Sequence, residues 1–195
     1  MSGAEYFDDG QAINPFMGGT NAVDISVAIA EHALLKRTLE GLGVTVITTP
    51  SPVDLQDGAY TANDPAARAY ARERSHKMLD IAQALGTGLV VVWLAREGTY
   101  MREAKDAARA VDLLAEALDD MLDYAPGMRF AIEPKPNEPM DLAYIPTIGH
   151  AVALGFKTKD PSRVGVLVES AHAVLAGLDP ADEMAFGLAY GKLWS

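Results

Sequence analysis

The 195-residue sequence contains no cysteine. This absence excludes disulfides, thiolate nucleophiles, and zinc or iron–sulfur sites built on cysteine. It also fits a reducing compartment, so we expect a cytoplasmic protein.

Positive charge is scarce, because 16 lysines and arginines stand against 27 aspartates and glutamates, for a net charge of −11. A protein that binds nucleic acid usually presents a basic stripe to the phosphate backbone. We therefore expect no nucleic-acid partner, whereas binding of cations stays compatible with the composition.

Long hydrophobic segments are missing as well. No apolar run reaches the length needed to span a bilayer, so we expect no membrane partner. The first ten residues, MSGAEYFDDG, have neither an apolar core nor a basic flank, which predicts that they are no signal peptide. No linker, repeat or low-complexity stretch divides the chain, so residues 1–195 are predicted to form a single domain.

The sequence does contain short apolar runs that alternate with longer amphipathic patterns. The apolar runs are nearly continuous, as expected of parallel strands buried on both faces. They predict strands at 44–49, 89–93, 129–133 and 164–169, with 192–195 opening a fifth. The amphipathic patterns predict helices at 23–42, 64–85, 103–124 and 145–156, and a short helix after Asp179. Strict alternation indicates an α/β fold with right-handed crossovers.

Two α/β architectures compete, a doubly wound open sheet and a TIM (β/α)8 barrel. No glycine-rich phosphate loop follows any predicted strand, which weakens the nucleotide-binding version of the open sheet. Polar segments follow the strands instead: TTPSP, WLAREG, EPKPNEP and ESAH. Carboxylates at the carboxyl ends of several strands are typical of a TIM barrel site.

The segment EPKPNEP places a carboxylate and an ammonium group at the end of a predicted strand. Glu133 and Lys135 are two residues apart, so they point to the same side of an extended backbone. Pro134 and Pro136 favour that extended backbone and are tolerated because strand pairing ends there.

The next predicted strand ends in VLVESAH, with Glu169 expected at the position that Glu133 occupies in its own strand. His172 follows three residues later. Two carboxylates and an imidazole on neighbouring strand ends predict a site for a divalent metal such as Mg²⁺ or Mn²⁺. The alternative is that each glutamate is a solvated loop residue or a helix cap.

Other polar and aromatic residues have two interpretations. Trp93 ends an apolar strand, where it either packs in the core or forms the wall of a substrate pocket. Arg96 and Glu97 are interpreted as a pair. The remaining histidines, His32, His76 and His150, lie in helical patterns and are interpreted as structural or solvated.

Four segments of the chain together resemble the xylose isomerase family. RFAIEPKPNEPMDLAYIPTIGHAVAL resembles its signature region, and VVVWLAREGTY is similar to its Trp–x–x–Arg–Glu–Gly segment. DGAYTANDPAARAYARER resembles a loop and its following helix, and VGVLVESAHAVLAGLDP resembles the second glutamate strand. The resemblance covers about 45–195 and is closer to the rhamnose/xylose isomerase-like branch.

The resemblance implies an aldose–ketose sugar isomerase with a TIM barrel and two divalent metal ions, Mg²⁺, Mn²⁺ or Co²⁺. It implies that Glu133 ligates the first ion, Glu169 bridges both and His172 ligates the second. Lys135 would hydrogen-bond a substrate oxygen beside the migrating hydrogen. Trp93 would form an apolar wall over C1 and C2 of the small-molecule sugar.

The sequence also departs from the family pattern. The aspartates that complete the family's metal site come from later strands and have no counterpart here. Phe7, followed by Asp8 and Asp9, stands where the family has a ring-opening histidine. We therefore expect an incomplete barrel of about four to five βα units. Open strand edges and an uncovered apolar face then favour a homo-oligomer.

Three functions follow from these observations. The first is a divalent-metal-dependent sugar isomerase, or a fragment of one, that moves a hydride between C1 and C2. The second is a non-catalytic chain with the isomerase fold and an incomplete metal site. The third, a related metal-dependent barrel acting on abasic DNA, is opposed by the net charge of −11.

Overall fold

The computed structural model describes residues 5–7, 45–48, 57–138 and 140–194. The predicted helix at 23–42 lies outside these residues, as do Asp8 and Asp9. Side chains are described from Asp57 onwards, with the exception of Leu85.

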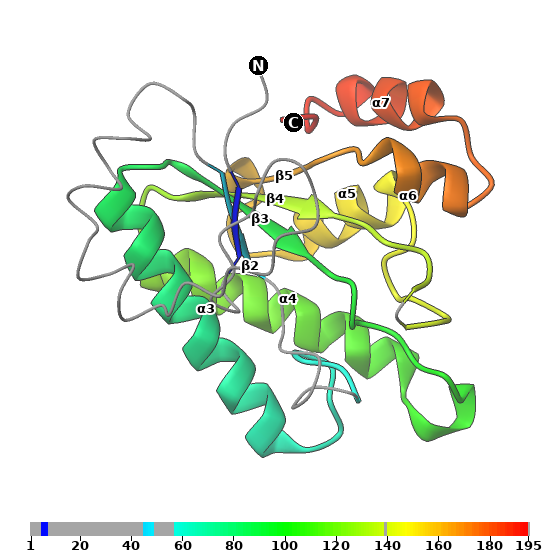
Figure 1. Ribbon diagram of the computed structural model, residues 1–195, viewed down its shortest axis with the longest axis horizontal. Helices are drawn as coiled ribbons and strands as arrows, with labels where there is room; N and C mark the ends of the chain where they lie inside the picture. Colours follow the sequence, from blue (N-terminus) through cyan, green and yellow to red (C-terminus); the bar gives the residue numbers. More distant parts are fainter. Residues whose placement is uncertain (1–4, 8–44, 49–56, 139, 195) are drawn as a thin grey trace.

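Short strands and helices alternate along the described residues (Figure 1). The strands are β1 (Glu5–Phe7), β2 (Thr45–Thr48), β3 (Leu89–Trp93), β4 (Arg129–Glu133) and β5 (Val164–Val166). The α-helices are α3 (Pro65–Leu85), α4 (Ala107–Tyr124), α5 (Ile148–Lys157), α6 (Ser170–Leu175) and α7 (Pro180–Ala189). Two 3-10 turns, η1 (Arg102–Ala104) and η2 (Pro161–Arg163), precede α4 and β5.

The five strands form one parallel sheet in the order β1-β2-β3-β4-β5. Each strand after β1 pairs with the one before it in the chain, which confirms the predicted sequential order and the strands predicted at 44–49, 89–93 and 129–133, whereas β1 was not predicted. A doubly wound sheet reverses its strand order at a switch point, and the described sheet has none. The arrangement is that of an incomplete TIM barrel, as predicted.

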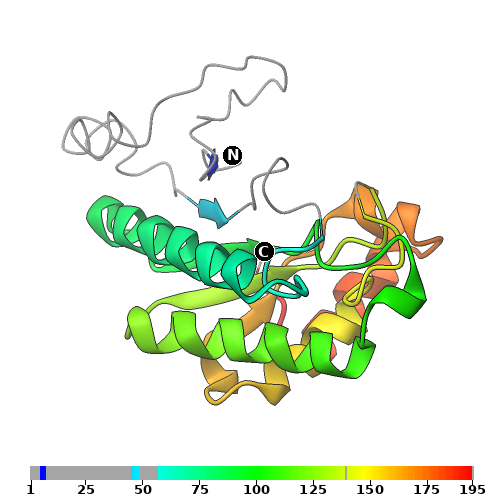
Figure 2. The same ribbon diagram turned by 90° about the horizontal axis from the view of Figure 1, so that it is seen from below.

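The two faces of the sheet differ in what covers them. Val90, Val92, Phe130 and Ile132 belong to the main hydrophobic core, which also contains buried side chains of α3, α4 and α5. Figures 1 and 2 show α3 and α4 side by side along this face. Because side chains alternate along a strand, Val91 and Ala131 lie on the opposite face, in a small cluster with Leu89, Trp93 and Leu167. In a closed barrel this second face would line the interior.

Side-chain caps set where the helices begin. Asp64 accepts a hydrogen bond from the Ala66 amide, and Pro65 occupies the first turn of α3, as the sequence predicted. Asp106 accepts from the Arg109 amide, so α4 begins at Ala107 rather than 103. The predicted start of α5 at 145 is also wrong, because Pro146 biases Ile145 towards an extended backbone.

The last two strands are shorter than predicted. β5 ends at Val166 instead of 169, and the following residues lead into α6. The strand predicted at 192–195 is a single parallel bridge between Val166 and Leu193. None of the described helices combines the length and the apolar character needed to cross a membrane.

Candidate functional site

The candidate site lies at the carboxyl ends of β3 and β4. Trp93 and Glu133 are register partners at the last position of these two strands. Both follow the alternation that places Val91 and Ala131 on the sheet face away from α3 and α4. The fold therefore brings together two residues that are 40 positions apart in sequence.

Glu133 contacts His172, which projects from the short helix α6. The Nδ1 atom of His172 lies 3.3 Å from Oε1 of Glu133 and 3.1 Å from the carbonyl oxygen of Pro134. Both side chains are close to nine-tenths buried. The predicted meeting of a carboxylate and an imidazole at neighbouring strand ends is thus present for this pair.

The environment of His172 favours its neutral form. Burial lowers the pKa of this imidazole, and the nearby positive charge of Lys135 lowers it further. A neutral ring that donates its Nδ1–H to the Pro134 carbonyl keeps its lone pair on Nε2. A histidine that binds a metal ion through one nitrogen usually donates its other N–H in this way.

Lys135 and His172 both lie close to the indole of Trp93. The Lys135 Nζ atom is 5.2 Å from the centre of the Trp93 ring, and its side chain is only 11% exposed. The imidazole of His172 lies parallel to the indole, with ring centres 6.3 Å apart. The Trp93 Nε1–H is buried and has no hydrogen-bond partner among the described residues. A cation, an aromatic face and a carboxylate–imidazole pair therefore share one side of the strand ends.

Glu169 is placed differently from its prediction. Since Ile132 pairs with Val166, the strand position beside Glu133 is that of Leu167, and Glu169 lies two residues beyond it. Glu169 is the N-cap of α6, and its Oε1 accepts a hydrogen bond of 3.0 Å from the Ala171 amide. The alternative of a helix cap is therefore correct for this residue.

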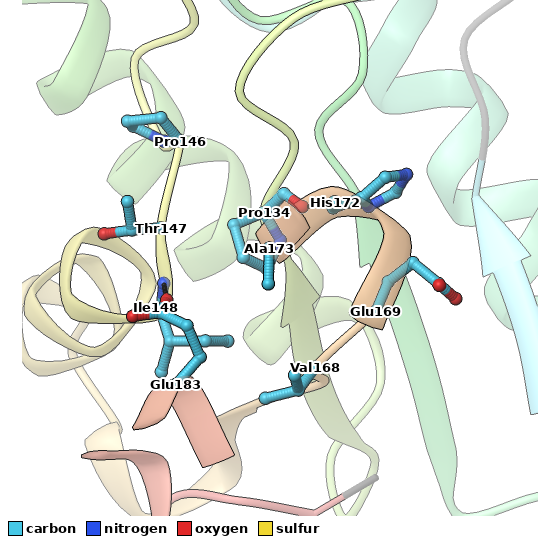
Figure 3. A pocket seen from close by; sticks show the side chains of 9 residues that line it. All are labelled: Pro134, Pro146, Thr147, Ile148, Val168, Glu169, His172, Ala173 and Glu183. Atoms are coloured by element: carbon cyan, nitrogen blue, oxygen red, sulfur yellow. Dashed lines mark hydrogen bonds between the residues drawn. The ribbon is translucent and has the colours of Figure 1, made fainter. Parts of the chain in front are cut away.

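Glu169 nevertheless remains near the other site residues. Figure 3 shows Glu169 and His172 projecting from the same side of the first turn of α6. Its negative charge raises the pKa of His172, against the larger effects of burial and Lys135. Among the described residues, however, no three histidine, aspartate or glutamate side chains are grouped closely enough to hold a metal ion.

A small pocket adjoins Glu169 and His172 (Figure 3). Its free volume is on the order of that needed to hold one water molecule. The residues lining it come from the ends of β4 and β5 and from α5, α6 and α7: Pro134, Pro146, Thr147, Ile148, Val168, Glu169, His172, Ala173 and Glu183.

The sequence interpretation assigned the wrong partner to one polar residue close to this site. Glu97 is 1% exposed and forms no ion pair with Arg96, so the predicted pair is wrong. Its carboxylate instead accepts hydrogen bonds from the amides of Ala59, Tyr60 and Thr61 and from the Thr61 hydroxyl. Burial raises the pKa of Glu97, opposed by these hydrogen bonds. The available signal was its place beside Gly98 in a loop that directly follows a buried strand.

The two described helix histidines both have partners within the protein, which agrees with their interpretation as structural residues. His76 lies 2.7 Å from Asp120 and stacks on Tyr124, and His150 lies 2.8 Å from the Thr147 hydroxyl. His32 lies outside the described residues.

Comparison with known proteins places these contacts in a family context. The family described as xylose isomerase-like TIM barrel matches residues 3–193. The chain is 39% identical over 160 residues to a xylose isomerase of Thermus thermophilus, across 79% of this chain and 41% of that protein. It is also 39% identical over 166 residues to a xylose isomerase of Thermus caldophilus, across 81% of this chain and 43% of that protein. The chain thus spans about two fifths of the length of these curated relatives.

Solved structures show the same fold at lower sequence identity. A D-tagatose 3-epimerase-like protein matches with a TM-score of 0.68 and 18% identity, covering 94% of this chain and 61% of that one. An L-ribulose 3-epimerase matches with a TM-score of 0.65 and 15% identity, covering 99% of this chain and 68% of that one. At such identities the likeness concerns the fold alone.

Proposed function

Because this chain belongs to the xylose isomerase-like TIM barrel family, we propose that it carries part of the site of a sugar isomerase that interconverts an aldose and a ketose. The observation that supports this most is the cluster of Trp93, Glu133, Lys135 and His172 at the carboxyl ends of β3 and β4. Active sites of TIM barrels lie at that end of the strands.

Lys135 is proposed to bind a substrate oxygen next to the carbon that gains or loses hydrogen. Its side chain is mostly buried, so a hydrogen bond to that oxygen is less screened by water than one at the surface. The contact with the Trp93 ring limits where the ammonium group lies.

Trp93 is proposed to form the apolar wall of the sugar site. An indole face over C1 and C2 keeps water away from the reacting carbons. Exclusion of water favours direct transfer of hydrogen between the two carbons over exchange with solvent. A small-molecule sugar is accordingly the proposed substrate.

A divalent cation, Mg²⁺, Mn²⁺ or Co²⁺, is proposed as the cofactor, held by Glu133, His172 and Glu169. The neutral His172, which donates its Nδ1–H to a backbone carbonyl, and the adjacent Glu133 carboxylate fit this role. Glu169 has to give up its cap of α6, at a cost of about 1 kcal/mol. When bound, such an ion polarises the carbonyl and hydroxyl oxygens of the substrate.

The second candidate is a non-catalytic chain with the isomerase fold. The observation that favours it is the hydrogen bond between Glu169 and the Ala171 amide, which leaves only Glu133 and His172 in contact. The two candidates differ in whether Glu169 takes part in binding a metal ion.

Calorimetric titration of the 195-residue chain with MnCl₂ separates these candidates. Glu169→Ala removes both the carboxylate and the cap, whereas Glu169→Asn removes the negative charge and keeps a good N-cap residue. We expect weak Mn²⁺ binding in the wild type, its loss in both variants, and a thermal stability of Glu169→Asn close to that of the wild type. Glu73→Ala, on the exposed face of α3, is the control and should bind as the wild type does.

Retained Mn²⁺ affinity in Glu169→Asn would exclude this ligand set and favour the non-catalytic candidate. We also expect little or no conversion of D-xylose or L-rhamnose by the chain alone, because three ligands are too few to fix two ions. Robust turnover by the purified, mass-verified chain would contradict that expectation.

A further inference from the structure

Glu97 joins two loops that are far apart in the sequence. Its Oε1 accepts hydrogen bonds from the amides of Ala59 and Tyr60, at 3.2 and 3.0 Å. Its Oε2 accepts from the Thr61 amide at 3.0 Å and from the Thr61 hydroxyl at 2.5 Å. One fully buried carboxylate thus binds three consecutive backbone amides of the segment 57–62, which precedes α3.

Residues 97–99, which follow β3, are also hydrogen-bonded to a third loop, the one that follows β4. The Tyr144 amide donates to the Glu97 carbonyl at 3.0 Å, and the Thr99 amide donates to the Asp141 carbonyl at 3.1 Å. Within that loop Glu138 and Leu142 have φ values of 53° and 47°. Non-glycine residues rarely adopt this left-handed backbone unless the surrounding contacts hold it.

Short connections lead from Glu97 to the candidate site. The Glu97 amide donates to the Leu94 carbonyl, which closes a tight turn directly after Trp93. The Leu94 amide donates to the Glu133 carbonyl, which ties the ends of β3 and β4 together. Lys135 lies near the start of the loop that residues 97–99 bond to at Asp141 and Tyr144.

The segment 57–62 is also fastened from its other side. Lys105, whose side chain is 3% exposed, donates from Nζ to the carbonyls of Asp57 and Thr61 and pairs with the Asp57 carboxylate. These bonds hold Asp57 and the Thr61 carbonyl without Glu97, but they do not reach the amides of Ala59, Tyr60 and Thr61. Loss of the Glu97 carboxylate should therefore loosen the amides of 59–61 without unfolding the domain.

We propose that Glu97 is a positioning residue, which anchors the segment 57–62 to the turn after β3 and thereby holds Trp93 and the Lys135 loop in place for the sugar. The role in sugar binding rests on the proposed function. The anchoring itself does not, and it is testable without sugar or metal ion.

Glu97→Gln is the main test, because glutamine has the same shape but offers one acceptor oxygen where the carboxylate offers two. NMR-detected hydrogen exchange should show the amides of Ala59, Tyr60 and Thr61 exchanging about tenfold faster or more. The amides of Val91 and Ala131, in the centre of the sheet, should keep their wild-type rates. Glu73→Gln, at an exposed glutamate of α3, should change none of these rates.

A second measurement asks whether the effect reaches Trp93. The chain has two tryptophans, so in a Trp194→Phe background the fluorescence reports on Trp93 alone. Glu97→Gln should make this fluorescence more accessible to quenching by acrylamide, an effect that a purely local change at 59–61 would not produce. Thr61→Val, which removes only the hydroxyl bond to Glu97, should shift both measurements in the same direction by a smaller amount.

Unchanged exchange at 59–61 in Glu97→Gln would overturn the anchoring. Faster exchange with unchanged quenching of Trp93 would overturn the positioning role. If Glu97→Gln also accelerates Val91 and Ala131, the domain has opened, and Thr61→Val then decides by the same two criteria. Failure of Mn²⁺ binding or of sugar conversion bears on the proposed function and leaves these outcomes unaffected.

Discussion

At the scale of single residues, Gly98 determines how closely the loops after β3 and β4 approach each other. A Cβ atom at this position would lie 2.7 Å from the Asp141 carbonyl oxygen and 2.9 Å from Cγ of Met140. Two of the three nearest atoms are backbone, so the contact is relieved only by moving the loop. We expect Gly98→Ala to lower the free energy of unfolding by about 1–3 kcal/mol, measured by urea denaturation.

Gly88→Ala is the matched control, because a Cβ there meets no atom within 4 Å. It should change the free energy of unfolding by less than about 0.5 kcal/mol. Equal effects of the two substitutions would show that the close approach at Gly98 is not what matters.

Protonation of the buried Lys192 side chain makes the free energy of unfolding depend on pH in the alkaline range. Its Nζ donates to the carbonyls of Pro161 and Val164, and burial lowers its pKa from 10.5. Between the lowered pKa and 10.5 the unfolded chain binds more protons at this site than the folded chain, so this group makes stability rise with pH there. Below that window both states are protonated, and the contribution of this group no longer changes with pH.

We therefore expect the wild type to gain stability relative to Lys192→Met as the pH rises towards 10.5. Urea denaturation at several pH values measures this difference, and Lys77→Met, at an exposed lysine of α3, is the control. A constant difference between wild type and Lys192→Met across this range would contradict the prediction.

The site residues differ in how far the sequence predicts them. The sequence was enough to place Glu133 and Trp93 at the ends of two strands, because both strands are regular apolar runs, but it left the role of Trp93 open, since the pairing of Trp93 with Glu133 depends on the register between β3 and β4. It failed for Glu169, because the strand ends at Val166 and a glutamate before a helix is drawn to the free amides of its first turn. Glu97 was missed because its partners are 36 to 38 residues away and no local pattern reveals them.

At the scale of elements, the N-terminus of α5 is capped by a different helix. Its N-cap residue, Thr147, makes no capping bond, whereas the Glu183 carboxylate of α7 accepts a hydrogen bond of 2.7 Å from the Ile148 amide. This bond joins α7 to α5, and the negative charge of Glu183 also interacts favourably with the positive end of the α5 dipole. The capping of α5 is thus at the same time a contact between helices.

We expect Glu183→Ala to destabilise the protein by about 1–2 kcal/mol. Asp182→Ala removes a neighbouring acidic residue from the first turn of α7 and serves as the control. Thermal unfolding followed by circular dichroism compares the two variants. The assignment of Glu183 as the cap would be wrong if Asp182→Ala were as damaging.

The element boundaries show the same division between local and distant causes. The starts of α3 and α7 follow from Asp64–Pro65 and Asp179–Pro180, which are complete local signals. The end of β5 depends on its neighbours, since the Val166 amide bonds to the Lys192 carbonyl and the Leu167 amide to the Ile132 carbonyl. The hydrophobic pattern alone had predicted that β5 continues to residue 169.

At the scale of the whole molecule, α6 and α7 expose a set of large apolar side chains. Leu188 is 63% and Val174 is 65% exposed. The others on these helices and the turns that follow them are Leu175, Leu178, Met184, Phe186 and Tyr190. Apolar surface of this kind favours association.

The expected homo-oligomer remains a prediction, which light scattering on the purified chain tests. We expect a dimer or larger assembly that Leu188→Lys weakens. Met101→Lys, at an equally exposed residue next to η1, should leave the assembly unchanged. A monomeric, thermally stable wild type would exclude the prediction.

The sequential pairing of the strands has a consequence for synthesis on the ribosome. The strands β2, β3, β4 and β5 each pair with the strand that precedes them in the chain. The pairing partner of each of these strands has therefore already been synthesised when the strand leaves the ribosome. Nascent chains grow from the N-terminus at roughly 5–20 residues per second. The segment from β3 to β4 is therefore translated within seconds, while closing its 35-residue connection requires no later part of the chain. Such a sheet can assemble one unit at a time, in the direction of translation.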